Sequence, residues 1–266
     1  MLKTLFDGVV FIHVLAGIIA IATFWLPTLA RKGGPLHKRV GRYYSYAMYS
    51  VALSALLLCS VRLFSPLPLL PADLTAAAPE RIARFVARSQ MIGGFLGVLA
   101  ILVIANVRHG LLVLAAKAER VQLRAPAHLL LLVVLLLAGS IGTYAGFSRG
   151  FVLLQIFGPL AALNAVGMAR YSFKTSLTPR QWIIEHLGNL LGAGIATHTA
   201  VLVFGAGRIV NQWLPAGYEL LPWVAPGVIG IIASQLYSRH YRKRFAKPAA
   251  VTVEVEAPAG VLQSAN

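Results

Sequence analysis

Seven long apolar runs constrain the fold of this chain more than any other feature of its sequence. A helix needs about 20 apolar residues to cross about 30 Å of hydrocarbon. Runs of that kind cover residues 6–30, 43–64, 90–107, 127–146, 151–169, 182–207 and 220–237 of the 266 residues. We therefore predict an all-α polytopic membrane helix bundle of seven transmembrane helices over residues 1–247, followed by a disordered tail over residues 248–266. The runs leave no room for a second, soluble domain.

The composition excludes the soluble classes. Hydrophobic residues make up 58% of the chain and charged residues only 12%, whereas a soluble domain carries about 25% charged residues. The formal net charge of +16 is typical of nucleic-acid binding, but the basic residues lie in short blocks between apolar runs, as in membrane proteins. We expect the lipid bilayer and no nucleic acid as partner. The single cysteine, Cys59, excludes an intrachain disulfide and a cysteine-based metal site.

The basic residues also predict an orientation. Most of the 24 Lys and Arg residues fall on one side if the N-terminus is outside, so we predict the C-terminus inside. Anionic lipid headgroups are the expected partners of that inner face. Arg81, Arg84 and Arg88 recur at helical spacing before the third run. This predicts that the third helix starts near Pro79 and continues to about Arg120.

Small and polar residues indicate which helices are central. The first, third and sixth runs carry stripes of Gly, Ala and polar residues that let helices approach closely, and we predict that these three form the core. The sixth run has such residues on two nearly opposite faces: one includes Glu185 and Asn189, the other Gly194 and His198. The fourth run opens with ten residues that are almost all large and apolar, so we expect it at the periphery.

Ionisable residues at membrane depth are expensive to bury and indicate function. His13 and His198 are predicted at similar depth on two central helices, and a pair of imidazoles from different helices can bind haem or a metal. His186 and His109 form a second such pair at the inner side. The cofactor would be haem b or a transition metal. The alternative for every one of these histidines is an ordinary interhelical hydrogen bond, which we assign to His128 and His240.

The inner side carries further polar candidates. Glu185 is the only acid well placed within a span, and with His186 and His37 it makes a possible non-haem metal set. The same residues suit a proton relay without a cofactor. The loop between the first two runs combines a Gly-Gly-Pro turn with cations that suit an anionic headgroup, although topology alone explains its charge. The residues noted for these roles besides the histidines are Lys32, Gly33, Arg39, Glu185 and Asn189.

Two stretches resemble a family of uncharacterised bacterial multi-pass membrane proteins known only as a domain of unknown function. The first has His13 and Gly17 in one helix, then Lys32 and Gly33, then His37, Lys38 and Gly41 before the next helix. The second is EHLGNLLGAGIATHTAVLVFGAG, with Glu185, His186, Asn189, His198 and Thr199. The resemblance implies a bacterial inner-membrane location and no established activity. It groups His13, His37, His186 and His198 as one constellation.

Three classes of function remain open from the sequence. A redox or electron-transfer protein binds a haem or metal through the intramembrane histidines, and this is our leading prediction. A proton-coupled or small-molecule transporter has a polar cavity within the membrane and depends on Glu185. A structural or assembly subunit has no such cavity. The spans hold no Ser/His/Asp set or carboxylate pair, so hydrolysis is not expected, and no protein partner is predicted.

Overall fold

The structure is a computed structural model that describes residues 1–75 and 77–246, so the predicted tail over residues 248–266 lies outside the described residues. Within these ranges the secondary structure is entirely helical. The α-helices are α1 (Leu2–Leu29), α2 (Pro35–Phe64), α3 (Pro79–Ala116), α4 (Pro126–Arg149), α5 (Val152–Ser172), α6 (Gln181–Ala200), α7 (Gly207–Trp213) and α8 (Leu221–Ala246). Short 3-10 turns η1 (Leu67–Leu69), η2 (Ala72–Leu74) and η3 (Arg120–Arg124) lie in the connections, and a π-helical turn, η4 (Val201–Gly205), follows α6.

Seven of these helical segments are long and apolar enough to cross a membrane, which confirms the predicted all-α bundle for the described part of the chain. The third helix starts at Pro79, as predicted, and ends at Ala116, four residues before the expected end. The seventh predicted span is the N-terminal part of α8, which continues to Ala246. The orientation with the N-terminus outside stays a prediction.

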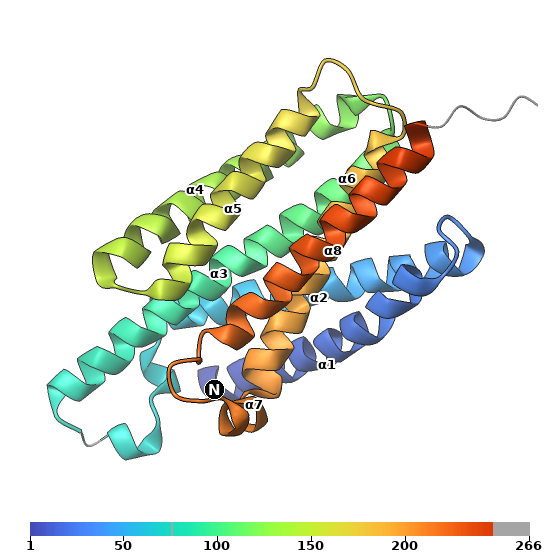
Figure 1. Cartoon of the computed structure of the whole chain (residues 1–266). Coiled ribbons are helices and arrows are strands. Elements are labelled where there is room, and N and C mark those ends of the chain that lie inside the picture. The colour runs from blue at the N-terminus through green and yellow to red at the C-terminus, as the bar shows by residue number, and fades with distance from the viewer. Residues whose placement is uncertain (76, 247–266) are drawn as a thin grey trace, which may run out of the picture.

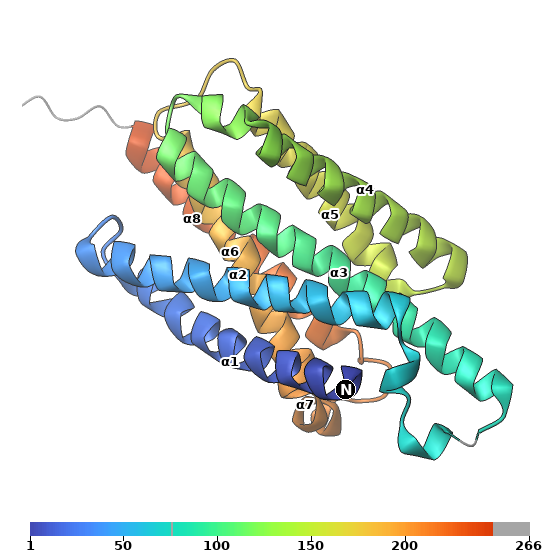
Figure 2. The same ribbon diagram turned by 180° about the vertical axis from the view of Figure 1, so that it is seen from behind.

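Helix α3 is the centre of the bundle. Figures 1 and 2 show it running between two hairpins, α1/α2 on one side and α4/α5 on the other, with α6 and α8 packed together along it. Over their most apolar stretches, 56% of α3 is buried but only 11% of α1. The prediction that α1 belongs to the core is therefore wrong: its small residues let α2 and α6 approach, while most of its surface is left for lipid.

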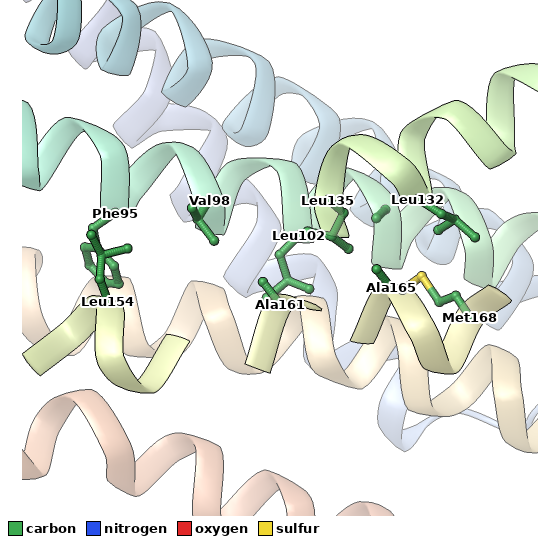
Figure 3. Packing of buried hydrophobic residues seen from close by; sticks show 10 residues of the cluster. Phe95, Val98, Leu102, Leu132, Leu135, Leu154, Ala161, Ala165 and Met168 are labelled. Carbon is green, nitrogen blue, oxygen red and sulfur yellow. The ribbon is translucent and has the colours of Figure 1, made fainter. Parts of the chain in front are cut away.

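The α4/α5 hairpin closes through glycines that the apolar start of α4 does not reveal. A Cβ atom at Gly139 would lie 2.6 Å from the backbone nitrogen of Ala162, and one at Gly158 would lie 2.6 Å from that of Thr143. Backbones can approach this closely only where both helices present small residues. The hairpin then packs on α3 through an apolar core (Figure 3) that includes Phe95, Leu135 and Leu154. Helix α4 lies at the edge of the bundle, as predicted.

Helix α6 is packed on two sides, which confirms the prediction from its small residues. On one side, the ring of Phe24 in α1 occupies the space that a Cβ atom at Gly194 would need. On another, Asn106 of α3 lies against Gly192. The regular helix gives way at Val201 to the π-helical turn and then to α7. This break was not predicted, because the apolar run continues through it.

Candidate functional site

The described ends of α1, α3, α5 and α8 lie at one end of the bundle, together with the beginnings of α2, α4 and α6 (Figure 1). We call it the basic end, because most of the Lys and Arg residues lie in its connections and in the adjoining parts of the helices. Five of the seven histidines lie at or near this end. The other two, His13 and His198, lie deeper.

His13 bonds to α2 and to nothing beyond it among the described residues. Its Nδ1 lies 3.0 Å from the carbonyl oxygen of Val51 and 3.0 Å from the Oγ of Ser54. A carbonyl oxygen only accepts, so Nδ1 carries the proton. The hydroxyl of Ser54 in turn donates to the carbonyls of Ser50 and Val51. This is an interhelical hydrogen bond of the ordinary kind.

His198, in α6, contacts α1 at a different level from His13. Its ring packs edge-on against Phe24 and Trp25, with centroids 5.0 Å and 5.6 Å apart, and its Nδ1 donates to the carbonyl of Gly194 in its own helix. Phe24 follows His13 by eleven residues in α1, a separation of roughly 16 Å along the axis. The structure therefore does not bring His13 and His198 to one level, and the haem-binding pair predicted from their depth is not formed.

The loop between α1 and α2 folds back onto the end of α1. Gly33 has a φ of +77°, a conformation that other residues rarely adopt, and the turn carries Lys32 and His37 to the last carbonyls of α1. Lys32 donates to the carbonyls of Pro27 and Thr28, and His37 Nδ1 donates to that of Pro27. Partial desolvation of the ammonium group lowers the pKa of Lys32. Lys32, Gly33 and His37 thus cap α1, while Arg39 is exposed on α2.

The contact between α3 and α6 determines the positions of two further candidate residues, His186 and Glu185. A Cβ atom at Gly110 would collide with the terminal methyl group of Leu190 and lie 3.2 Å from the Cβ of Asn189, so a larger residue here would require side chains of α6 to shift. His186 donates from Nδ1 to the carbonyl of Gly110 over 2.9 Å. Its neighbour Glu185 points to another side of α6, because successive helical residues are turned by about 100°.

Glu185, His109 and His128 form a line across three helices, which we call the relay cluster. The Nδ1 of His109 in α3 lies 3.0 Å from the Nε2 of His128 in α4. The Nε2 of His109 lies 3.4 Å from the Oε1 of Glu185 in α6, an ion-pair distance rather than a hydrogen bond. Both histidine side chains are fully buried, whereas that of Glu185 is 26% exposed. Asn189 donates to the same Oε1 and holds the carboxyl group in place.

A direct contact between two imidazoles has two arrangements of protons. In the first, Glu185 is protonated, His109 donates from Nδ1 to His128, and His128 carries its proton on Nδ1. In the second, Glu185 is ionised, His128 donates from Nε2 to His109, and His109 carries its proton on Nε2, facing the carboxylate. The two states differ by one proton. Each imidazole gains a proton on one nitrogen and loses one from the other, which is the property that suits histidine to proton transfer.

The same geometry does not suit the predicted metal and haem sites. A metal needs its ligands to converge on one point, but His109 directs its two nitrogens to opposite neighbours. His37 and His186 each bond from Nδ1 to a different backbone carbonyl. Among the described residues, no group of three or more His, Cys, Asp and Glu side chains is placed to hold a metal ion. The set of Glu185, His186 and His37, and the pair of His186 with His109, are not assembled as ligand sets.

The interhelical hydrogen bond predicted for His128 is confirmed by its contact with His109, but the sequence did not predict that its partner is a second histidine. The turn η3 folds α4 back along α3, and this buries the His128 side chain against His109. The ring of Tyr171 in α5 packs edge-on against His109 at 5.8 Å. The phenolic oxygen of Tyr171 and the Nδ1 of His128 are buried without a hydrogen-bond partner among the described residues. Buried polar atoms without partners are uncommon and call for an explanation; the Nε2 of His198 is another such atom.

An open cavity of about 490 Å³ with a mixed polar and apolar lining adjoins the relay cluster; we call it the polar cavity after the polar groups that line it. It extends along α6 from Ile184 to Gly192, roughly 12 Å at the rise of an α-helix. Glu185 lines it and so belongs to both features. Its polar lining residues are Asn106, Asn164, Glu185, Asn189 and Ser238, from α3, α5, α6 and α8.

Fold and site together indicate an integral membrane protein: its described residues include seven helices long and apolar enough to cross a membrane, and a polar cavity beside a buried histidine pair. Comparisons with known protein families, with curated proteins and with solved structures find no match.

Proposed function

We propose that this chain is a proton-coupled transporter of a small solute, in which the relay cluster carries the proton and the polar cavity holds the solute. The observation that supports this most is the double position of Glu185. Its carboxyl group lines the cavity and also faces His109, 3.4 Å away. Because Glu185 belongs to both features, its protonation couples the charge in the cavity to proton uptake and release at the basic end.

The proton moves along the cluster with each transfer balanced. The Glu185 carboxyl group gives its proton to Nε2 of His109, which gives the proton on its Nδ1 to Nε2 of His128. His128 then gives the proton on its own Nδ1, which is buried and has no acceptor among the described residues, to a water molecule that enters from the basic end. The distance of 3.4 Å shortens in the transfer step, as hydrogen bonds at resting sites commonly do.

The break at the end of α6 also favours transport. The helix that lines the cavity turns into a π-helical turn at Val201–Gly205 and then into α7. Discontinuous helices are typical of transporters and π-turns are frequent at functional sites, and this turn begins nine residues beyond Gly192, the last α6 residue that lines the cavity.

Haem or metal binding is the competing proposal, and it has less support because the nitrogens of His109 face His128 and Glu185 rather than a common point. An absorbance spectrum and metal analysis of the purified protein separate the two proposals.

The resemblance to the uncharacterised family, and with it a bacterial inner-membrane location, also belongs to what we propose. The shared residues are consistent with it, since Lys32, Gly33 and His37 cap α1 and Glu185 and Asn189 line the cavity.

Proton movement driven by a solute gradient tests the proposal without knowledge of the solute. Liposomes containing the protein are loaded with the small-molecule filtrate of a cell extract and diluted into plain buffer, and a dye in the lumen reports pH. We expect proton movement above that of empty liposomes. Glu185→Gln and His128→Gln should lose it by roughly 100-fold, the scale of a lost proton-transfer group.

His240→Gln is the matched control, because His240 is exposed and lies outside the relay cluster. It should move protons as the unsubstituted protein does. Equal movement with Glu185→Gln, or movement no greater than in empty liposomes, would overturn the proposal.

A further inference from the structure

The polar cavity has an unusual charge for this chain. The sequence has 24 Lys and Arg residues but only 8 Asp and Glu residues. Among the described residues that line the cavity, one is an acid, Glu185, and none is basic. The three lining asparagines add amide oxygens that accept hydrogen bonds. The cavity thus offers a carboxylate and neutral acceptors, which is the chemistry that binds a cation.

The rest of the lining is apolar. Leu160, Leu163, Met168 and Ile184 face the same space. A strongly hydrated inorganic ion gains little from such a wall, whereas the carbon body of an organic ion is stabilised by it. The volume of about 490 Å³ lies within the usual range of small-molecule sites, about 300 to 1,000 Å³.

Resting on the proposed function, we propose that the cavity binds a small organic monocation, such as a protonated or quaternary amine, in exchange for the proton on Glu185. The cation pairs with the Glu185 carboxylate, and its carbon body packs against the apolar wall. Binding displaces one proton from Glu185 to His109 and through His128 to the basic end. Charge in the cavity is conserved, because one positive charge enters as another leaves.

The groups around Glu185 are compatible with this exchange. His109 faces it from α3 and Tyr171 lies near it from α5, while His186 neighbours it on α6. From α8, Ser238 joins the cavity to a smaller one of about 280 Å³ that contains Arg239. Arg239 lines the smaller cavity and not the larger one that contains Glu185. Glu185 is the carboxylate with which a cation in the cavity would pair.

Binding of defined probes to the purified protein in detergent tests the inference. The cations are methylammonium, cyclohexylammonium and tetraethylammonium, and the controls are neutral cyclohexanol and anionic cyclohexanecarboxylate. We expect saturable stabilisation of the fold by at least one cation, with release of protons to a pH indicator, and neither response with the controls. Glu185→Gln should weaken cation binding about tenfold or more, since a hydrogen bond to a charged group contributes on that scale.

A cavity-filling variant keeps the test sharp if Glu185→Gln folds poorly. Gly188 lines the cavity, and an added Cβ atom there meets nothing within 4 Å, so Gly188→Leu extends into open space. It should abolish cation binding. The matched control is Gly17→Leu in α1, where an added Cβ atom also meets nothing within 4 Å, and it should bind as the unsubstituted protein does.

The outcomes separate this inference from the proposed transport. Cation binding that Gly188→Leu removes, without solute-driven proton movement in liposomes, keeps the cavity assignment and contradicts proton coupling. Proton movement without binding of any cation probe keeps the coupling and overturns the cation. Binding of the neutral or anionic control as tightly as the cations also overturns it.

Discussion

The two deeper, partly buried histidines and the two fully buried histidines of the relay cluster have different kinds of hydrogen-bond partner. His13 donates to a carbonyl of the neighbouring helix α2, and His198 donates to a carbonyl of its own helix. A carbonyl cannot take up a proton, so these bonds fix a single tautomer. His109 instead lies between an imidazole and a carboxyl group, each of which gains or loses protons. In the proposed relay, the hydrogen-bond partner, rather than depth in the membrane, separates a structural histidine from one that can pass a proton.

The largest effect that follows from this contrast is on proton movement. His109→Gln and His128→Gln should each slow solute-driven proton movement by roughly 100-fold, and the double variant should be no slower, because groups acting in series are strongly non-additive. The measurement is lumenal pH in liposomes. His13→Gln is the control and should retain the unsubstituted rate. Independent, multiplying losses would remove the series arrangement from the account.

The next effect is on the free energy of unfolding, and it compares the packing around His198 with the packing around the relay cluster. An added Cβ atom at Gly194 would meet the ring of Phe24, and one at Gly110 would meet Leu190. Overpacking of this kind costs about 1 to 3 kcal/mol, so both alanine variants should lower the free energy of unfolding, measured by denaturation in mixed micelles. Only Gly110→Ala should also slow proton movement, because it displaces α6 beside Glu185. Equal slowing by Gly194→Ala would show that the two regions are not separate.

A smaller effect tests the structural role of His13. His13→Leu removes the hydrogen-bond donor to the carbonyl of Val51 and puts an apolar side chain of similar length in its place. Interhelical hydrogen bonds in membrane proteins contribute about 0.6 kcal/mol on average, and the free energy of unfolding should fall by that amount with proton movement unchanged. Loss of proton movement in this variant would place His13 in the conducting path.

The smallest effect concerns the cap of α1. Lys32→Gln replaces an ammonium group that binds two carbonyls at the end of the helix. A cation at a helix C-terminus contributes about 0.3 to 1 kcal/mol, so the free energy of unfolding should fall by about 0.5 kcal/mol. Lys38→Gln, at an exposed position on α2, is the matched control and should change nothing. Equal losses would assign the effect to net charge rather than to the cap.

The sequence was sufficient for the spans but not for the partners of the histidines. Apolar length predicted seven spanning helices, and small residues on two faces predicted how α6 is packed. The side chain of Glu185 was recognised because a single acid in a span is conspicuous. Depth along a helix, however, assumes that helices run parallel at matched levels, and His198 meets α1 at Phe24, far from His13.

The sequence predicted an interhelical hydrogen bond for His128, but its partner, His109, escaped prediction for a physical reason as well. Its burial depends on the turn η3, which folds α4 back so that a residue at a helix start faces His109, nineteen residues earlier in the chain. The cavity likewise depends on side chains from four helices, α3, α5, α6 and α8. Hydropathy and helical periodicity describe one helix at a time and carry no information on such meetings.

The most direct test of the account is the nitrogen NMR spectrum of the imidazoles in ¹⁵N-histidine-labelled protein in lipid bilayers, with His109→Gln and His128→Gln used for assignment. The account predicts a scalar coupling across one N–H···N bond between His109 and His128. It also predicts that both rings exchange tautomers together as pH is changed, and that Glu185→Gln removes this exchange. Two uncoupled rings, each with a fixed tautomer at every pH, would contradict it.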